Sequence, residues 1–348
     1  MTQSTRTLIT SIAAVAAAAL TLTACAGEGG SGENTGDGNG SSVDTLSIDY
    51  ATYNPLSLII KEQGWLEEEL EADGVDVEWV FSAGSNKANE NLRANAIDVG
   101  STAGSAALLS RSTGTPIKTI DVVGNVEWTA LVAAEDSDIT EVTDLEGSSV
   151  AATRGTDPYF FLVQALDEAG VDLNSVEVQN LQHADGRTAL QNGSVDAWAG
   201  LDPIMASAES EGANLFYRNV DLNTYSFLNA TESFIEESPE LAQLVVDTYE
   251  RARAWALENP DETAQILADE ADIDLELAQT VIGERSGFDI SPVPGDDQYA
   301  VLERIAPIFV STGDVDDQAT IDTALEELFE PRFAEAAADP ADADDTEE

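Results

Sequence analysis

The chain has 348 residues, of which 14 are Lys or Arg and 67 are Asp or Glu, so its formal net charge at pH 7 is −53. A field of this sign repels nucleic acid and anionic membrane surfaces, which excludes nucleic acid as a partner. There is one cysteine and one histidine, which excludes a disulfide framework and any Cys-rich or His-rich metal site. We therefore expect no cofactor, no metal and a fold held by an ordinary apolar core. The acidity itself we attribute to solubility or to a salty exterior, where such a field is screened.

The first 25 residues have the pattern of an export signal. Arg6 is basic, residues 8–22 are apolar, and LTAC occupies positions 22–25. The apolar run is shorter than the ~20 residues of a membrane span, and its end resembles a bacterial lipobox. We expect residues 1–24 to be a lipoprotein signal peptide and lipidation of Cys25 to hold the exported protein on the outer face of the cytoplasmic membrane. A plain secretory signal or a single membrane anchor is the alternative.

The rest of the chain divides into a tether, a folded part and a tail. Residues 25–43 are mostly Gly, Ser and acids, which predicts a disordered tether. Residues 334–348 predict an acidic disordered tail. The folded part lies between residues 44 and 333.

Apolar spacing in the folded part predicts two series of alternating strands and helices. The first has strands at 46–51, 75–81, 97–102, 117–124 and 129–135, and helices at 56–74, 86–96 and 105–114. The second has strands at 148–153, 176–181 and 196–202, and helices at 157–170 and 185–193. From Ser238 onward the chain is nearly all helical. The alternation predicts an α/β fold with largely parallel sheets.

Two extended apolar stretches, near 126–135 and 220–231, are candidate crossings between two lobes. A pair of such crossings would act as a two-strand hinge. We therefore predict a first lobe made of residues 44–128 and 226–333 and a second lobe made of residues 129–225.

Small polar residues follow four of the predicted strands, and open α/β sheets bind ligands at the carboxyl ends of their strands. The turns are TYNP (52–55), SAGS (82–85), STAGS (101–105) and TRGTDP (153–158). Each opens a helix, whose first N–H groups lack internal partners and whose dipole favours negative charge. Several such turns facing one cleft predict an anion site without lysine. Taken singly, each turn fits ordinary helix capping equally well, and DP at 157–158 reads as an N-cap followed by proline.

Four further residues are candidates with open alternatives. Trp128, at a predicted crossing, and Trp198, at a predicted strand end, would either wall the cleft or pack in the core. Arg154 precedes a turn glycine and would either bind an anion through two N–H groups or form a surface ion pair. His183 lies in a predicted loop before a helix, and we interpret it as structural or exposed.

Seven segments occur in an order typical of a known family: IIKEQGWL (59–66), SAG (82–84), IDVG (97–100), DLEG (144–147), ADGRTAL (184–190), VDAW (195–198) and DP (202–203). The set resembles the ABC-transporter substrate-binding lipoproteins of the aliphatic sulfonate, taurine and nitrate type, over roughly residues 45–330. The resemblance implies a two-lobed type II periplasmic-binding fold, with two α/β lobes joined by a two-strand hinge and a helical C-terminal part. By position it implies ligand contacts at Tyr53, Asn54, Ser82, Gly84, Thr102, Ser105, Gly155, Thr156 and Asp202.

The resemblance implies a monomeric binding protein rather than an enzyme. It would capture a small organic anion, an aliphatic sulfonate or taurine, and deliver it to an ABC permease. Asp202, with Glu127, would suit the ammonium of a zwitterion, or Asp202 would be structural. Nitrate is an alternative ligand, as is a thiamine pyrimidine precursor, which Tyr53, Trp128 and Trp198 could stack upon. A secreted enzyme on the same fold and a surface sensor or adhesin are the weaker alternatives.

Overall fold

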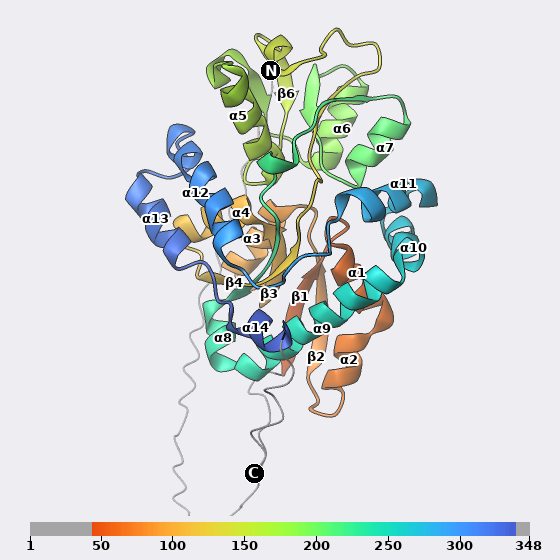
Figure 1. Ribbon diagram of the computed structural model, residues 1–348, viewed down its shortest axis with the longest axis vertical. Coiled ribbons are helices and arrows are strands. Elements are labelled where there is room, and N and C mark those ends of the chain that lie inside the picture. The colour runs from red at the N-terminus through yellow and green to blue at the C-terminus, as the bar shows by residue number, and fades with distance from the viewer. Residues whose placement is uncertain (1–43, 339–348) are drawn as a thin grey trace, which may run out of the picture. The chain divides into compact units, whose positions relative to one another are not determined.

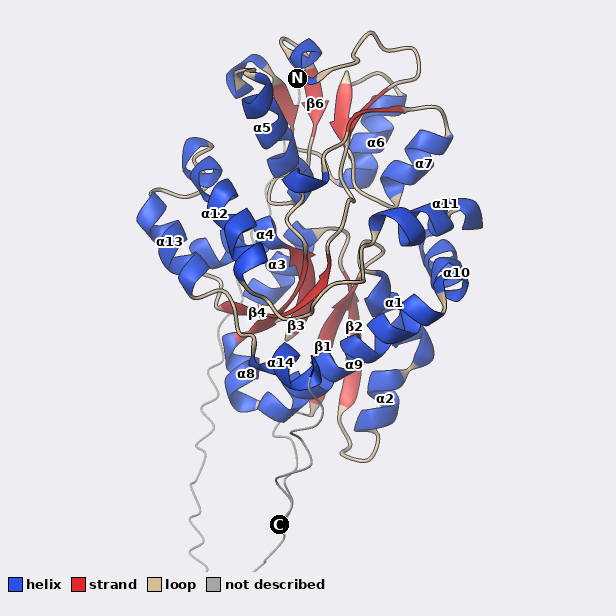
Figure 2. Cartoon of the chain, in the orientation of Figure 1, coloured by secondary structure: helices blue, strands red, loops and turns tan. Residues whose placement is uncertain are grey.

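The structure is a computed structural model that describes residues 44–338. The predicted signal peptide, Cys25, the tether and residues 339–348 therefore lie outside the described residues. Within residues 44–338, none of the helices combines the length and the apolar character that a membrane crossing requires. The described residues contain two five-stranded sheets (Figures 1 and 2).

The first sheet has the strand order β2-β1-β3-β10-β4. Its strands are β1 (Thr45–Tyr50), β2 (Asp76–Phe81), β3 (Val99–Ala103), β4 (Ile117–Gly124) and β10 (Ser226–Thr231). β1 runs parallel to β2 and β3, whereas β10 runs antiparallel to β3 and β4. The prediction of largely parallel sheets is wrong for β10, because the chain enters that strand from the second sheet and not through a helical crossover.

The second sheet has the order β7-β6-β8-β5-β9. Its strands are β5 (Leu131–Ala133), β6 (Ser149–Ala151), β7 (Glu177–Gln179), β8 (Ala197–Ala199) and β9 (Asn214–Tyr217). β6 is parallel to β7 and β8, and β5 is antiparallel to β8 and β9. Each sheet therefore receives one strand in the reversed direction from a segment that crosses between the sheets.

Helices follow the strands, as the sequence predicts. The first sheet carries α1 (Pro55–Gln63), α2 (Trp65–Leu70), α3 (Ser85–Arg93) and α4 (Gly104–Ser112), and the second carries α5 (Asp157–Ala169), α6 (His183–Gln191) and α7 (Ile204–Ser210). Short 3₁₀ turns span Val142–Leu145, Leu173–Ser175 and Val220–Leu222. The helix predicted over 56–74 is broken at Gly64, whose φ of 65° ends α1 in the left-handed region that glycine tolerates.

The C-terminal part is helical. It contains α8 (Glu232–Glu237), α9 (Pro239–Glu258), α10 (Pro260–Ala271), α11 (Leu275–Thr280), a π-helical turn η4 (Val281–Arg285), α12 (Asp296–Ser311), α13 (Gln318–Glu326) and α14 (Arg332–Ala338). Tyr249 and Val245 of α9 join the apolar core of the first sheet. Phe309 of α12 packs against Phe160 of α5, with ring centroids 4.7 Å apart. α14 continues past residue 333, where the sequence placed the start of the tail.

Two segments cross between the sheets, at 125–130 and at 218–225. They connect β4 to β5 and β9 to β10, which matches the predicted two-strand hinge. A third segment lies beside the first crossing, because Asn125 N–H donates to Gly287 O (3.0 Å) and Glu127 N–H donates to Arg285 O (2.8 Å). The lobe boundaries at residues 128–129 and 225–226 stay a prediction.

Candidate functional site

Predicted site residues from both sheets line one enclosed cavity. Tyr53 follows β1, Trp128 lies in the first crossing and Asp202 follows β8, and all three line a cavity of about 20 Å³. The Tyr53 and Trp128 rings meet edge to face, with centroids 5.9 Å apart. The remaining wall includes Ser226 and Arg285. In this closed arrangement the cavity has room for about one water molecule, so a larger ligand requires the lobes to separate.

Asp157 is hydrogen-bonded to both hinge segments and to the start of α4. This fully buried carboxylate accepts hydrogen bonds from Ser105 Oγ (2.6 Å), Trp128 Nε1 (3.0 Å), Thr224 N (3.0 Å) and Thr224 Oγ1 (2.6 Å). Burial raises its pKa, and these four donors oppose that rise. Ser105 and Trp128 are therefore brought together as predicted, but their polar groups are occupied by a carboxylate of the chain. Asp157 itself is the first residue of α5 and not its N-cap.

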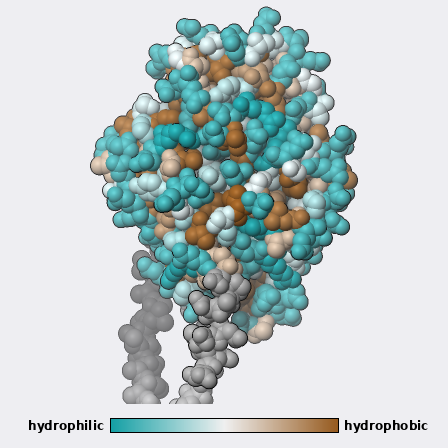
Figure 3. All heavy atoms as spheres, viewed as in Figure 1, coloured by the Kyte–Doolittle hydropathy of each residue, from teal (hydrophilic) through white to brown (hydrophobic). Residues whose placement is uncertain are grey.

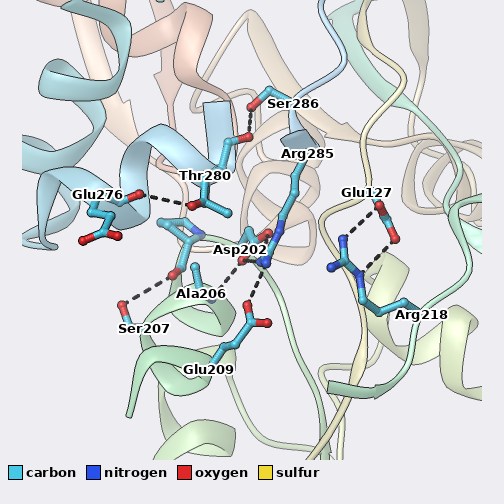
Figure 4. A network of polar contacts seen from close by, with 12 residues as sticks. Glu127, Asp202, Ala206, Ser207, Glu209, Arg218, Glu276, Thr280, Arg285 and Ser286 are labelled. Carbon is cyan, nitrogen blue, oxygen red and sulfur yellow. Dashed lines mark hydrogen bonds and ion pairs between the residues drawn. The ribbon is translucent and has the colours of Figure 1, made fainter. Parts of the chain in front are cut away.

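A buried ion pair joins the second sheet to the C-terminal part (Figure 4). Arg285 Nη1 lies 3.2 and 3.1 Å from the two carboxylate oxygens of Asp202, and Arg285 Nη2 lies 2.7 Å from Glu209 Oε2. The side chains of Arg285 and Asp202 are each 3% exposed. Burial raises the pKa of Asp202 to about 6, which Arg285 opposes. The sequence did not single out Arg285, because it lies in a helical segment far from any strand end.

Glu127, the other carboxylate suggested for an ammonium, is also paired. Its Oε2 lies 2.9 Å from Arg218 Nη2 at the edge of the site (Figure 4). Each of the two carboxylates that the sequence suggested as a partner for the ammonium of a zwitterionic ligand thus has an arginine of the chain beside it.

Gly84 and His183 meet where the two sheets face one another. A Cβ atom at Gly84 would lie 2.8 Å from His183 Nε2 and 2.9 Å from Asn86 Oδ1. His183 is the first residue of α6 and is only 1% exposed. Its predicted loop position is wrong, because α6 begins two residues earlier than expected. Of the two interpretations, structural or exposed, burial excludes the exposed one. Burial lowers its pKa to about 4, so the ring is neutral at pH 7.

The other predicted contacts fall into two groups. Some lie near the facing turns: the buried Asn54 donates to Tyr249 Oη (3.3 Å), the buried Thr156 Oγ1 donates to Thr153 O (2.6 Å), and the half-buried Gly155 lies beside Asn86. Others are engaged elsewhere. Thr102 Oγ1 accepts from Asn229 within the first sheet (2.9 Å), Arg154 stacks over the Tyr159 ring (4.8 Å), and Trp198 is packed in the core against Gly186.

Ser82 lies beside a buried carboxyl group, Asp49. Asp49 is fully buried in β1 and accepts from Ser101 N (2.8 Å) and Ser101 Oγ (3.2 Å). Burial raises its pKa to about 7, although the Ser101 hydrogen bonds oppose this rise. In residues 44–338 we find no group of three or more His, Cys, Asp and Glu side chains placed to hold a metal ion.

Comparison with known proteins places this arrangement in the periplasmic-binding-protein fold. The structure superimposes on the aliphatic sulphonate binding protein SsuA of Escherichia coli with a TM-score of 0.71 and 26% identity, covering 83% of this chain and 93% of that one. It also matches the alkanesulfonate-binding protein SsuA of Xanthomonas axonopodis, bound to MOPS, with a TM-score of 0.73 and 20% identity, covering 81% and 97%. The predicted fold class is confirmed.

The sequence pattern of the NMT1/THI5-like family matches residues 57–263, and the chain belongs to this family. A Bacillus subtilis relative, provisionally named an aliphatic sulfonates-binding protein, is 24% identical over 276 residues, which cover 78% of this chain and 82% of that one. The family resemblance inferred from the sequence is confirmed.

The fold is also used by an enzyme. The desulfurization enzyme DszB matches with a TM-score of 0.63 and 16% identity, over 86% of this chain and 99% of that one. At this identity the match establishes the fold alone.

Proposed function

We propose that this protein is an extracytoplasmic solute-binding protein of an ABC importer, which captures an aliphatic sulfonate between its lobes and delivers it to a permease. The sulfonate-binding names of its relatives, and the periplasmic location in the name of the Escherichia coli structure, support this class and location. The lipid anchor at Cys25 and the monomeric state remain parts of the proposal.

The observation that carries the proposal is the set of uncapped helix starts between the lobes. No side chain at the N-cap position caps α1, α3, α4, α5 or α6, each of which begins after a strand. By contrast, Thr231 caps α8 and Asp317 caps α13. An absent side-chain cap does not by itself distinguish these starts, because α7, α9, α10 and α11 also lack one. What distinguishes them is that their polar turns follow strands of both sheets. Helix dipoles and first-turn N–H groups at such starts favour an anion. The start of α4 is already engaged, because Gly104 N–H donates to Thr224 O (3.2 Å) and Ser105 N–H donates to Thr224 Oγ1 (2.8 Å).

The paired carboxylates favour a simple sulfonate over a zwitterion. Asp202 and Glu127 are each beside an arginine, so an incoming ammonium would have to compete with a guanidinium for either one. An alkanesulfonate has no ammonium group and therefore needs no carboxylate partner. Its hydrocarbon part can make apolar contacts with the rings of Tyr53 and Trp128, which line the cavity. No observation in the structure favours nitrate or a pyrimidine, or a catalytic role.

A thermal-shift panel tests this proposal. We expect ethanesulfonate to raise the unfolding temperature, because a ligand that binds only the folded state stabilises it by mass action. Taurine, nitrate, sulfate and an aminopyrimidine are the comparison ligands, and all buffers must be free of sulfonates. Taurine should shift the midpoint less than ethanesulfonate does. Absence of a shift with every sulfonate tested would refute the proposed ligand class.

A further inference from the structure

His183 presents an unpartnered nitrogen to the amino end of α3. The ring lies in the second lobe, and Gly84 and Asn86 belong to the turn and first residues of α3 in the first lobe. His183 Nε2 and Asn86 Oδ1 are both buried and have no hydrogen-bond partner. Both atoms approach Gly84 so closely that a Cβ there would overlap them. Buried polar atoms normally have partners, so two such atoms across a closing cleft indicate a place for a ligand group.

Thr153 determines which ring nitrogen carries the proton. Thr153 Oγ1 lies 2.7 Å from Leu181 O and 3.2 Å from His183 Nδ1. A hydroxyl has one hydrogen, and Leu181 O can only accept it. His183 Nδ1 must therefore donate to Thr153, which leaves Nε2 as a bare lone pair facing α3.

The surroundings of Nε2 favour negative charge. α3 has nine residues and no side-chain cap, so the N–H groups of its first turn and its dipole are directed at this place. The Asn86 amide can also donate once it is rotated. A neutral imidazole lone pair would repel an anion, whereas an imidazolium N–H would donate to it.

We propose that His183 and the amino end of α3 form the subsite for the anionic group of the ligand, and that His183 takes up a proton at Nε2 when the anion binds. The proposal rests on the proposed function. Anion and proton enter together, so the buried cleft gains no net charge. The incoming sulfonate receives N–H donors from both lobes, which ties ligand binding to lobe closure.

The pH dependence follows from the charges around the ring. Burial is the only cause that shifts the pKa of His183. The charged residues on the neighbouring elements are engaged or exposed: Asp185 on α6 is exposed, Lys87 on α3 pairs with Glu90, and Arg154 stacks on Tyr159. An adjacent anion raises the pKa of a histidine by about one to three units. Between about pH 4 and the raised pKa of the bound form, binding should therefore take up a proton and weaken as pH rises; above that range it should no longer depend on pH.

Calorimetric titration of the wild-type protein with ethanesulfonate tests this coupling. A sulfonate stays ionised throughout the range, so any proton taken up belongs to the protein. With a free pKa of about 4 and a bound pKa one to three units higher, we expect the affinity at pH 5 to exceed that at pH 8 by about two- to eightyfold. At pH 6, cacodylate and imidazole buffers, which differ in ionisation enthalpy, should give different heats that reveal proton uptake.

The matched variant is His183→Gln, which keeps a polar side chain but cannot be protonated. It should bind ethanesulfonate more weakly at pH 5, with little pH dependence and no proton uptake. Asp49→Asn is the control, because that buried carboxyl has a pKa of about 7 and titrates in the same range, and it should retain the pH dependence. A pH-independent wild-type affinity, or proton uptake that persists in His183→Gln, would overturn the inference while the proposed function stands. If the wild-type protein binds no sulfonate at any pH, the proposed function fails as well.

Discussion

Asp49 is a buried carboxyl group that no cation neutralises in any ion pair found among residues 44–338. Its folded-state pKa of about 7 lies above the ordinary value of 3.8, with burial as the main cause. The folded protein therefore binds more protons than the unfolded chain between these values. The stability that the protonated group provides is present below about pH 4 and is lost as pH rises through about 7.

We predict that Asp49→Asn flattens this loss, because the amide resembles the protonated acid and has no charge to bury. At pH 8 the variant should exceed the wild type in free energy of unfolding by a few kcal/mol, at about 1.4 kcal/mol per pKa unit. Urea titrations at pH 5 and pH 8 measure this difference. If the stability gap is the same at both pH values, Asp49 does not titrate in this range.

Single residues differ in how far the sequence reveals them. Tyr53 and Asp202 could be predicted because chain order alone places the residues after each strand at one edge of a sheet. Arg285 and His183 could not, since each reaches the site from a helix whose orientation depends on packing across the lobes. Arg154 carries the same local signal as the others, but its side chain stacks on Tyr159 instead.

At the scale of elements, Arg285 joins η4 to α7, because it pairs with Asp202 just before α7 and with Glu209 within α7. Asp202 is 3% exposed, whereas Glu209 is 42% exposed. We predict that Arg285→Gln costs about 3–5 kcal/mol of unfolding free energy, because it leaves Asp202 buried without a counter-charge. Glu209→Gln removes only the outer partner and should cost less than about 1 kcal/mol.

Urea unfolding of both variants and of Arg285→Gln combined with Asp202→Asn measures these effects. The double variant should recover part of the lost unfolding free energy, since it also removes the buried Asp202 charge that would otherwise have no counter-charge. Equal losses in Arg285→Gln and Glu209→Gln would show that the buried pair does not join the two elements.

The order and type of most elements follow from apolar spacing, but strand direction does not. Alternating strands and helices predicted the parallel cores of both sheets, which the structure contains. The reversed strands β5 and β10 carry no distinguishing pattern, because each is buried on both faces. The break at Gly64 could not be predicted from apolar spacing, since that spacing continues across Gly64 into α2.

At the scale of the whole molecule, the main feature is the large net negative charge. The face shown in Figure 3 is mostly hydrophilic, with hydrophobic residues confined to smaller patches, and the formal net charge is −53. Self-repulsion of this size destabilises a compact state and is screened by salt, since the Debye length falls from about 30 Å at 0.01 M to about 3 Å at 1 M.

We predict that the unfolding temperature rises between 0.01 M and 1 M NaCl, by roughly 2–4 °C for each kcal/mol of repulsion that is relieved. Scanning calorimetry in NaCl and KCl measures it, and the two salts should act alike because screening depends on ionic strength. An unchanged or lower midpoint would mean that the acidic surface does not strain the fold.

The position of β10 has a consequence for how the chain acquires its structure during synthesis. β10 lies between β3 and β4, so the first sheet stays incomplete until residue 231 has been made, although its first strand begins at Thr45. The second sheet is built from one uninterrupted stretch, from Leu131 to Tyr217, and these two end residues are cross-strand partners. An N-terminal fragment that ends before β10 therefore contains every strand of the second sheet and leaves the edges of β3 and β4 open to other chains.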